Sequence, residues 1–363
     1  MKIAFYGSSL LSSYWNGAAT YYRGILRALA ERGYEITFFE PDAFDRQEHR
    51  DINPPAWARS VVYPATPDGL ARVLAEAGGA DVVVKANGVG VFDRELLEGV
   101  LHEARPDALV IYWDVDAAAT LDEMRRQPDH PVRQALPQLD LVFTYGGGPQ
   151  VVEAYREFGA RECVPIYNAL DVSTHHPVPP DPRFASNLAF LANRLPDREK
   201  RVEEFFLRAA AALPEKKFLI GGNGWADKAM PENVAAIGHV GTGSHNAFNC
   251  TPRAVLNVAR DSMAAIGFSP ATRVFEAAGA GACLITDSWE GIEMFLTPDE
   301  EVLVARDGKD VAEHLKGLTQ ERAGAIGRNA MARVRAEHTY ELRAAEVDGV
   351  LKRLRETRRE VVA

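Results

Sequence analysis

The residues from Ala192 to Arg201 place four cations within eight positions, directly after a predicted strand. Positive charge at the start of a helix suits a diphosphate, because the helix dipole attracts anions there as well. The alternative is an ordinary charged helix start held by i,i+4 ion pairs. Ligands of open α/β sheets bind beyond the carboxyl ends of the strands, which favours the diphosphate interpretation. The four cations are Arg194, Arg198, Lys200 and Arg201.

A charged pair, Arg273 and Glu276, lies on one face of a predicted helix over 271–280. Pro270 and Thr272 mark the start of this helix, and small residues let it pack tightly on the strand that follows. A carboxylate in this position can accept both hydroxyls of a ribose, and the arginine can bind a phosphate. The alternative is a surface ion pair, which contributes little to stability.

Two glycine-containing turns follow predicted strands in the same half of the chain. Gly224 lies in the turn over 221–225, and Val240 lies in the turn over 239–241. Glycine permits positive φ and lets a ligand approach the backbone closely. The first turn can therefore face a ligand, and the backbone at Val240 can meet the edge of a nucleobase. A simple turn explains these glycines equally well.

Polar residues also follow two strands in the first half of the chain. Asn16 and Gly17 precede a predicted helix, where small residues let N–H groups approach an anionic or polyhydroxyl ligand. Otherwise they form only a loop and a helix cap. Lys85 ends a buried strand and Asn87 follows it. This pair either lines a ligand cleft, or Lys85 simply extends its ammonium group out of the sheet to water.

Asp114 and Asp116 lie at the end of another predicted strand. Paired carboxylates can hold a divalent metal or act as a general base. Asp116 can instead cap the helix that begins at Ala117. We take Asp114 as the candidate base.

Strand and helix patterns alternate along the whole chain, which predicts parallel sheets. Residues 171–184 interrupt the pattern with four prolines and His175-His176, so this segment predicts a linker. Strands are predicted before it at 2–6, 35–39, 81–85, 108–113, 139–144 and 163–166. Strands are predicted after it at 188–191, 217–220, 234–237, 254–258, 282–286 and 301–305. We expect two Rossmann-like, doubly wound α/β domains that face each other across a cleft.

Composition narrows the class of protein. The chain has 363 residues, 47% of them hydrophobic, which fits two globular domains and excludes a disordered chain. Its formal net charge of −10 makes nucleic acid an unlikely main partner, because an acidic surface repels phosphates. The three distant cysteines lack zinc spacing and predict reduced thiols. No secretory signal or membrane-spanning run is present, so we expect a cytoplasmic protein.

The chain resembles the glycosyltransferases of GT-B fold. The segment from Phe275 to Thr286 is similar to the E-A-x-A-x-G-x-P-V-I motif of their donor domain, and Asn193-Arg194-Leu195 to their phosphate loop. Asn168-Ala169-Leu170-Asp171 resembles the N-G-V-D at their domain junction. Within the superfamily, Arg273 to Glu276 and Asp287 to Glu293 are most similar to the spore-maturation (CgeB-like) glycosyltransferases.

The resemblance implies roles and boundaries. Glu276 would bind the donor ribose, Arg194 with Arg198 or Arg201 the diphosphate, and Val240 the nucleobase. Relatives often carry a second glutamate seven residues earlier, where this chain has Ser269, so the donor-sugar contact and the stereochemistry stay open. The expected parts are an acceptor domain over 1–170, a hinge over 171–185, a donor domain over 186–338, and a helix over 339–363 that returns to the first domain.

The leading hypothesis is therefore a glycosyltransferase that moves a sugar from a nucleotide diphosphate to a small-molecule or glycan acceptor. UDP is favoured as the donor nucleotide by the resemblance, which also implies that neither a permanently bound cofactor nor a metal is needed. Asp114 and Arg194 are the candidate catalytic residues. A nucleotide-sugar epimerase and a non-catalytic nucleotide-sugar-binding protein are the alternatives. The candidate acceptor-binding residues are Asn16, Gly17, Lys85 and Asn87.

Overall fold

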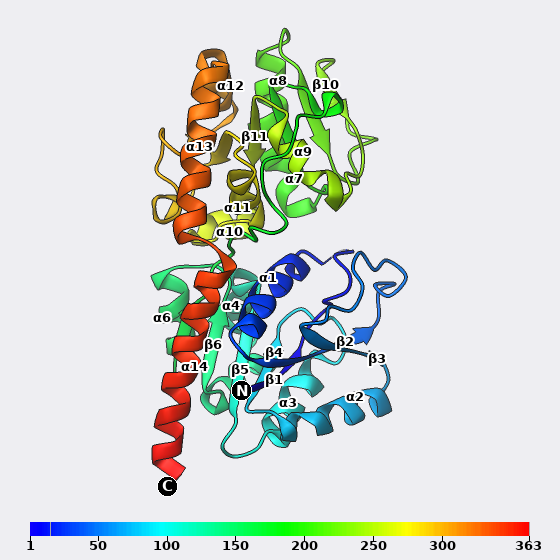
Figure 1. The fold of residues 1–363 in the computed structure, drawn as a ribbon, viewed down its shortest axis with the longest axis vertical. Helices are drawn as coiled ribbons and strands as arrows, with labels where there is room; N and C mark the ends of the chain where they lie inside the picture. Colours follow the sequence, from blue (N-terminus) through cyan, green and yellow to red (C-terminus); the bar gives the residue numbers. More distant parts are fainter. Residues whose placement is uncertain (15, 363) are drawn as a thin grey trace. The chain divides into compact units, whose positions relative to one another are not determined.

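The computed structural model describes residues 1–14 and 16–362, and their contacts divide the chain into two units. Unit 1 is built from two stretches, Met1–Tyr167 and Tyr340–Ala363, whereas unit 2 is the continuous stretch Asn168–Thr339. The chain therefore leaves unit 1, completes unit 2, and returns to unit 1 (Figure 1).

In the described residues, the sheet of unit 1 has seven parallel strands: β1 (Lys2–Tyr6), β2 (Glu35–Asp42), β3 (Ala58–Pro64), β4 (Val82–Ala86), β5 (Leu109–Asp114), β6 (Leu141–Thr144) and β7 (Cys163–Pro165). Their order is β3-β2-β1-β4-β5-β6-β7. β4 and β5 are buried along their whole length, as expected for a parallel sheet covered on both faces. The order reverses between β1 and β4, and such a switch point is where ligands of these sheets bind.

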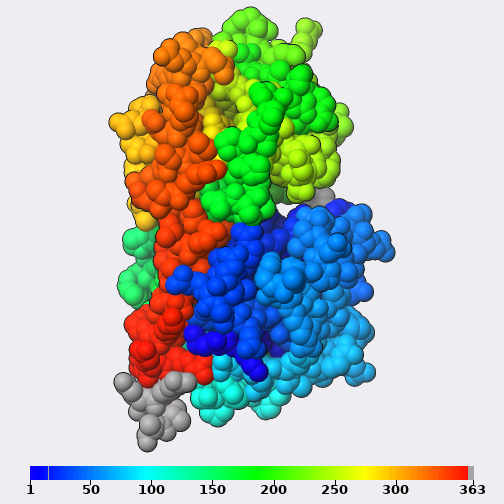
Figure 2. All heavy atoms as spheres, in the orientation of Figure 1, coloured from blue at the N-terminus to red at the C-terminus, as the bar shows by residue number. Residues whose placement is uncertain are grey.

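The helices of unit 1 connect these strands, and the last one comes from the end of the chain. They are α1 (Ala18–Glu31), α2 (Pro67–Leu74), α3 (Asp93–Glu103), α4 (Ala117–Arg126), α5 (Pro131–Ala135), α6 (Pro149–Glu157) and α14 (Tyr340–Val362). α14 packs beside α1 (Figure 1). Figure 2 shows the red residues of α14 lying against the blue residues of the first strand-helix pair.

α14 is held on unit 1 by close packing and by ions. Gly24 of α1 has no side chain where the Tyr340 ring lies, and a Cβ atom there would be 2.2 Å from that ring. The side chains of Tyr34 and Arg32 donate to Asp348, at 2.8 and 3.2 Å. The end of the chain is thus part of the first unit.

Unit 2, all of whose residues are described, contains a sheet of six parallel strands: β8 (Leu188–Leu191), β9 (Phe218–Gly221), β10 (Val234–Ala236), β11 (Ala254–Asn257), β12 (Leu284–Asp287) and β13 (Leu303–Ala305). Their order, β10-β9-β8-β11-β12-β13, is the Rossmann order, and it reverses between β8 and β11. The helices are α7 (Pro196–Val202), α8 (Arg208–Ala212), α9 (His245–Cys250), α10 (Asp261–Ile266), α11 (Thr272–Gly279), α12 (Gly308–Gly317) and α13 (Gln320–Glu337).

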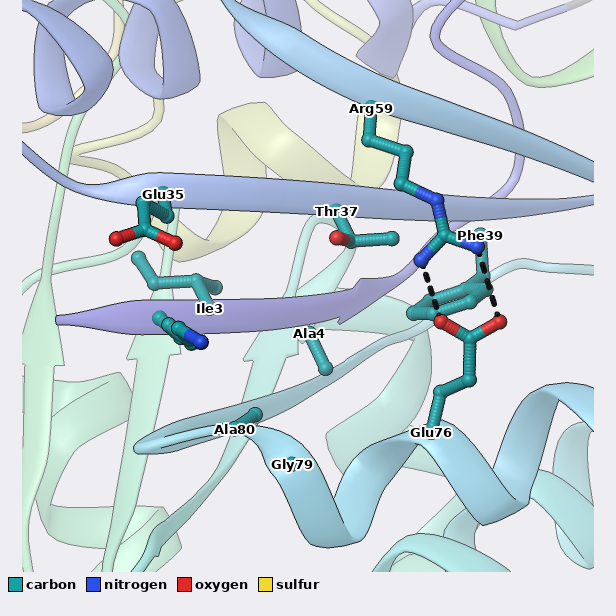
Figure 3. A pocket seen from close by; sticks show the side chains of 10 residues that line it. Ile3, Ala4, Glu35, Thr37, Phe39, Arg59, Glu76, Gly79 and Ala80 are labelled. Carbon is teal, nitrogen blue, oxygen red and sulfur yellow. Dashed lines mark hydrogen bonds and ion pairs between the residues drawn. The ribbon is translucent and has the colours of Figure 1, made fainter.

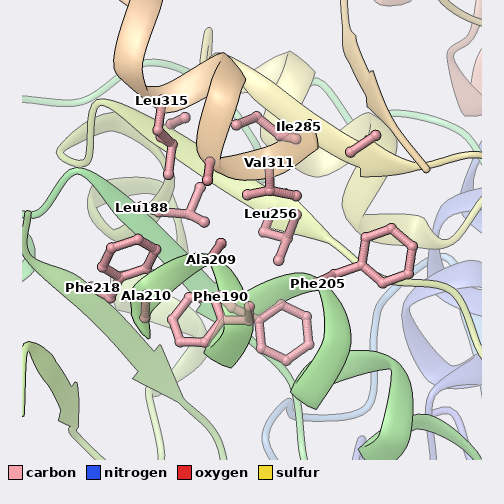
Figure 4. Close-up of a cluster of buried hydrophobic side chains, with 14 of the residues drawn as sticks. Leu188, Phe190, Phe205, Ala209, Ala210, Phe218, Leu256, Ile285, Val311 and Leu315 are labelled. Atoms are coloured by element: carbon pink, nitrogen blue, oxygen red, sulfur yellow. The ribbon is translucent and has the colours of Figure 1, made fainter. Parts of the chain in front are cut away.

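The core of unit 2 forms between its sheet and the helices α8 and α12 (Figure 4). Phe190 and Leu256 extend from neighbouring strands towards Ala209 of α8 and Val311 of α12, and all four are buried. A π-helical turn over Glu203–Leu207 joins α7 to α8 and turns Phe205 and Phe206 into this core. The packed sheet gives the loops at its carboxyl edge a rigid base.

The prediction of two Rossmann-like α/β domains is confirmed by these two sheets. The sequence analysis gives no element between Phe39 and Asp81, where the structure has β3 and α2. β3 is an edge strand whose residues are mostly half-buried, so its sequence lacks a strong apolar pattern. The Pro-rich segment lies within unit 2, where Asn246 of α9 donates to the Thr174 carbonyl at 2.9 Å.

Candidate functional site

Two arginines near the switch point of unit 2 have unbalanced charge. Arg198 lies in α7, after β8, and Arg273 is the second residue of α11, between β11 and β12. Both are half-buried, and among the described residues neither side chain makes a hydrogen bond or an ion pair. Burial and the nearby guanidinium of Arg273 lower the pKa of Arg198 to about 10. Two desolvated cations in one place favour a bound anion, because it would relieve their repulsion.

The other arginines of this edge are already paired. Arg194 contacts Glu199 at 2.7 Å and Asp227 at 3.0 Å, and it also donates to the Gly224 carbonyl at 3.2 Å. Arg201 contacts the buried carboxylate of Asp287 at 2.5 Å. Protein carboxylates therefore neutralise two of the three arginines that the sequence assigned to a diphosphate, and Arg198 is the one that stays unpaired.

The carboxylate of Glu276 lies one helical turn after Arg273 and interacts with two histidines. Its Oε1 is 3.9 Å from Nε2 of His175. His245 also faces Glu276 and Arg273, and burial lowers the pKa of its imidazole while Glu276 opposes that shift. The fold thus brings Arg273 and Glu276 together with two residues that the sequence analysis did not assign to the site.

The turn after β9 has the close backbone packing that its glycines suggested, whereas Gly238 and Gly241 after β10 have open space beside them. Gly222 has φ +112°, and a Cβ there would be 2.1 Å from the Ala192 carbonyl oxygen. Only glycine therefore fits between this turn and the loop after β8. The Val240 carbonyl accepts from Nε2 of His245 at 3.1 Å, and Val240 lines a pocket of about 270 Å³ with Phe184 and His239.

Ser269, which stands where relatives have a glutamate, lies in a strained loop. Phe268 has φ +44°, a value that costs a non-glycine residue energy and is often found at functional sites. Its ring packs on Gly291, where a Cβ would be 2.2 Å away. The Ser269 hydroxyl donates to the Gly267 carbonyl at 2.9 Å. The loop before α11, over residues 267–271, therefore carries no carboxylate.

In unit 1, Asp114 ends β5 and is completely buried. One carboxylate oxygen accepts from the Asp116 N–H at 2.8 Å, and the other accepts from the Tyr155 hydroxyl. Burial raises the pKa of Asp114 to about 6, against the opposing hydrogen bonds. Both carboxylate oxygens thus accept hydrogen bonds from groups within unit 1. The role of Asp114 as a base stays a prediction.

The four candidate acceptor residues differ in what they contact. Lys85 is buried and forms an ion pair with Asp93, and burial lowers its pKa. Asn16 is buried and its amide donates to the Ser9 carbonyl at 3.0 Å. Asn87 is half-buried and accepts from the Val115 N–H at 2.9 Å, whereas Gly17 is exposed with open space beside it. Lys85 and Asn16 therefore shape loops at the β1–β4 switch point.

Glu40 is a further polar residue at this edge that the sequence analysis missed. It is buried at the end of β2 and accepts from the N–H groups of Leu10 and Leu11 at 2.5 and 3.2 Å. It also accepts from the Gln47 amide at 2.6 Å. A carboxylate directly after the predicted strand over 35–39 is the sequence signal that could have identified it, because such a group needs partners when it is buried.

A second pocket, of about 290 Å³, lies near the amino ends of β1 and β2 (Figure 3). Lys2 and Glu35, the first residues of those strands, line it. The ion pair of Arg59 and Glu76, at 2.5 Å, crosses it. Ligands of such sheets bind at the opposite ends of the strands, so this pocket is separate from the candidate site.

Nowhere in residues 1–14 and 16–362 do three or more His, Cys, Asp or Glu side chains gather as metal ligands would. Over the same residues, no helix combines the length and apolar character that crossing a membrane requires.

Comparison with known proteins finds glycosyltransferases among the proteins that this chain is similar to. Residues 198–349 match the family model described as "Glycosyl transferase-like". The sucrose-phosphate synthase of Thermosynechococcus elongatus superposes on 98% of this chain and 99% of its own, with a TM-score of 0.70 and 15% identity. No protein of curated function matches the chain in sequence.

Two further structures were solved with nucleotides. HepE of Anabaena, in complex with UDP-glucose, covers 97% of this chain and 99% of its own, with a TM-score of 0.67 and 14% identity. An α-glucosyltransferase, in complex with UDP and a 13-mer DNA, covers 97% and 99% with a TM-score of 0.67 and 12% identity. These likenesses establish the fold, which is that of the GT-B glycosyltransferases.

Proposed function

We propose that the protein is a glycosyltransferase of the "Glycosyl transferase-like" family, and that unit 2 binds a nucleotide-diphosphate sugar. One observation carries the proposal: the side chains of Arg198 and Arg273 are half-buried and unpaired among the described residues, and Glu276 lies one helical turn after Arg273. A diphosphate bears two negative charges, which match the two guanidinium groups. The match to the family model and the fold also support the proposal of a glycosyltransferase.

The chemistry follows from these positions. When the sugar leaves, negative charge grows on the diphosphate, and fixed guanidinium groups stabilise it without reorganising. Glu276 accepts the ribose hydroxyls, and the backbone near Gly224 and Val240 meets the base. Arg201 is held by Asp287 and Arg194 by Glu199, and these two arginines support the segment that follows β8.

We propose UDP as the nucleotide, because the neighbouring HepE structure contains UDP-glucose. The two arginines supply the charge that a divalent metal would otherwise supply, so we expect chelation with EDTA to leave transfer intact. Loss of transfer with EDTA and its return with Mg²⁺ would show a metal requirement.

Unit 1 would bind the acceptor at the β1–β4 switch point, where Gly17 is exposed and Asn87 is half-buried. Asn16 and Lys85 would fix the loops there, and Asp114 is the candidate base for an inverting reaction. One neighbour is bound to DNA, but the net charge of −10 leads us to expect a small-molecule or glycan acceptor.

Titration calorimetry with UDP tests the proposal. We expect Arg198→Ala and Arg273→Ala each to weaken binding about tenfold to hundredfold, since each removes a charge-assisted contact. Arg306→Ala is the matched control, because this arginine follows β13 with 82% of its side chain exposed. Wild-type affinity in both site variants would contradict the assignment.

Turnover separates the proposal from its alternatives. A glycosyltransferase changes a UDP-sugar only when an acceptor, or water acting as one, is present. An epimerase would give a new UDP-sugar without an acceptor, and a binding protein would give no product at all. Following UDP-sugars by NMR, with and without a panel of glycan acceptors, distinguishes the three.

A further inference from the structure

The two adjacent histidines of the Pro-rich segment have different surroundings. His175 is buried, and its Nε2 lies 3.9 Å from Oε1 of Glu276. His176 is exposed, and its Nδ1 contacts the Pro177 carbonyl at 3.2 Å. Only the first of the pair therefore reaches the carboxylate that we assign to the ribose.

The position of His175 is set by the backbone around it. Its N–H donates to the Asp171 carbonyl at 3.0 Å, and its Nδ1 is 2.9 Å from the Thr174 hydroxyl. Asn246 of α9 donates to the Thr174 carbonyl at 2.9 Å, which fixes the segment on unit 2. With Nδ1 engaged, Nε2 is the ring nitrogen that faces Glu276.

The distance between the two groups suits a shared hydroxyl. At 3.9 Å, Nε2 and Oε1 are too far apart for a direct hydrogen bond. An oxygen about 2.8 Å from each atom can bridge them with good geometry, donating to the carboxylate while also contacting the imidazole. The side chains are 11% and 14% exposed, so such an oxygen would be largely shielded from water.

We propose that His175 and Glu276 together hold one ribose hydroxyl of the bound nucleotide, and that His175 makes the site selective for ribonucleotides. This inference rests on the proposed nucleotide site. It assigns a ligand-contacting residue to the Pro-rich segment. A buried polar pair that binds a hydroxyl rejects an analogue without it, because the pair is then left unpaired.

Calorimetry with UDP, 2′-deoxy-UDP and 3′-deoxy-UDP tests the proposal. We expect the wild type to bind one deoxy analogue at least about tenfold more weakly than UDP. His175→Ala should weaken UDP binding and bring UDP and that analogue to similar affinity. His175→Gln should recover part of the selectivity, because its amide still reaches the hydroxyl. His176→Ala, the matched control, should behave as the wild type.

Three results would overturn the inference. His175→Ala could leave UDP affinity and selectivity unchanged, or it could weaken all three ligands by one factor, which indicates a structural role only. The wild type could also bind all three ligands equally. Thermal unfolding of the unliganded variants checks that they fold. If His175→Ala does not fold, the affinities for UDP and its deoxy analogues are compared in His175→Gln instead.

UDP binding by the wild type and by Arg198→Ala tests the proposed function separately from the role of His175. If UDP binds the wild type, and Arg198→Ala weakens it while His175→Ala does not, the nucleotide site stands and only the role of His175 is wrong. If the wild type binds neither UDP nor its deoxy analogues, both the site and this role are wrong.

Discussion

Asp114 shows how a single buried carboxylate couples stability to pH. Its pKa is about 6 in the folded protein, above the value of 3.8 for an exposed carboxyl, because burial disfavours the charge. Between these two pH values the folded state holds a proton that the unfolded state has lost. Asp114 therefore stabilises the fold most below pH 4 and loses this contribution as pH rises to 6.

We expect Asp114→Asn to remove this dependence. Going from pH 4 to pH 7, the stability of the variant relative to the wild type should rise by about 2–3 kcal/mol, because the slope approaches 1.4 kcal/mol per pH unit only between the two pKa values. Urea unfolding at several pH values measures it. Carboxylates whose pKa is lowered, such as Asp81 and Asp348, titrate in both proteins and cancel in the difference.

Asp107→Asn is the matched control, because Asp107 is an exposed carboxylate just before the same strand. A wild-type-to-variant difference that is flat with pH would contradict the shifted pKa. The same Asp114 variant tests the catalytic prediction, since an inverting transfer requires a base and Asp114→Asn would then lose transfer while it still folds.

Residue types at the site could be predicted from the sequence, but their pairing could not. The cations of residues 194–201 and the Arg273–Glu276 pair are visible in the chain. Arg194 pairs with Glu199, five residues away, but also with Asp227, 33 residues away, and Arg201 pairs with Asp287, 86 residues away. His175 is likewise 101 residues from Glu276, and no local pattern joins them.

At the scale of elements, the contact of α1 with α14 depends on a glycine. Gly24 lies inside α1, where glycine weakens a helix, yet alanine would place a Cβ 2.2 Å from the buried Tyr340 ring. Gly349 lies inside α14 with nothing within 4 Å of such a Cβ. Both glycines lie inside helices, but only Gly24 has another side chain packed closely against it.

We therefore expect opposite effects from the same substitution. Gly24→Ala should destabilise the protein by about 1–3 kcal/mol through overpacking. Gly349→Ala should stabilise it by about 0.5–1 kcal/mol through helix propensity. Urea unfolding measures both, and equal effects of the two substitutions would show that α14 does not depend on the close approach at Gly24.

Helices and strands could be predicted where their burial requires a recognisable pattern of apolar residues. β4 and β5 are buried throughout and stand out as apolar runs, whereas the half-buried edge strand β3 does not. The helical segment from α7 to α8 contains the π-helical turn Glu203–Leu207. A π-helical turn holds more residues than an α-helical turn, and here it packs Phe205 and Phe206 in the core. The periodicity of the sequence cannot show this.

At the scale of the whole molecule, unit 2 is an insertion between two parts of unit 1. Its two ends pair with each other: the Leu170 N–H donates to the His338 carbonyl at 2.8 Å, and Leu170 bridges to Thr339. It has its own sheet and its own core. Every residue that we assign to nucleotide binding, from His175 to Glu276, lies inside it.

These facts predict that residues 168–339 form an independent nucleotide-binding domain. Because its ends already meet and its core is complete, the isolated segment should fold, as judged by circular dichroism and cooperative unfolding. It should bind UDP within about threefold of the full chain, a difference below 1 kcal/mol. Arg198→Ala should weaken UDP binding by the same factor in both. A folded segment that does not bind UDP, beside a full chain that does, would mean that unit 1 supplies part of the nucleotide site, because folding and binding would then have separated.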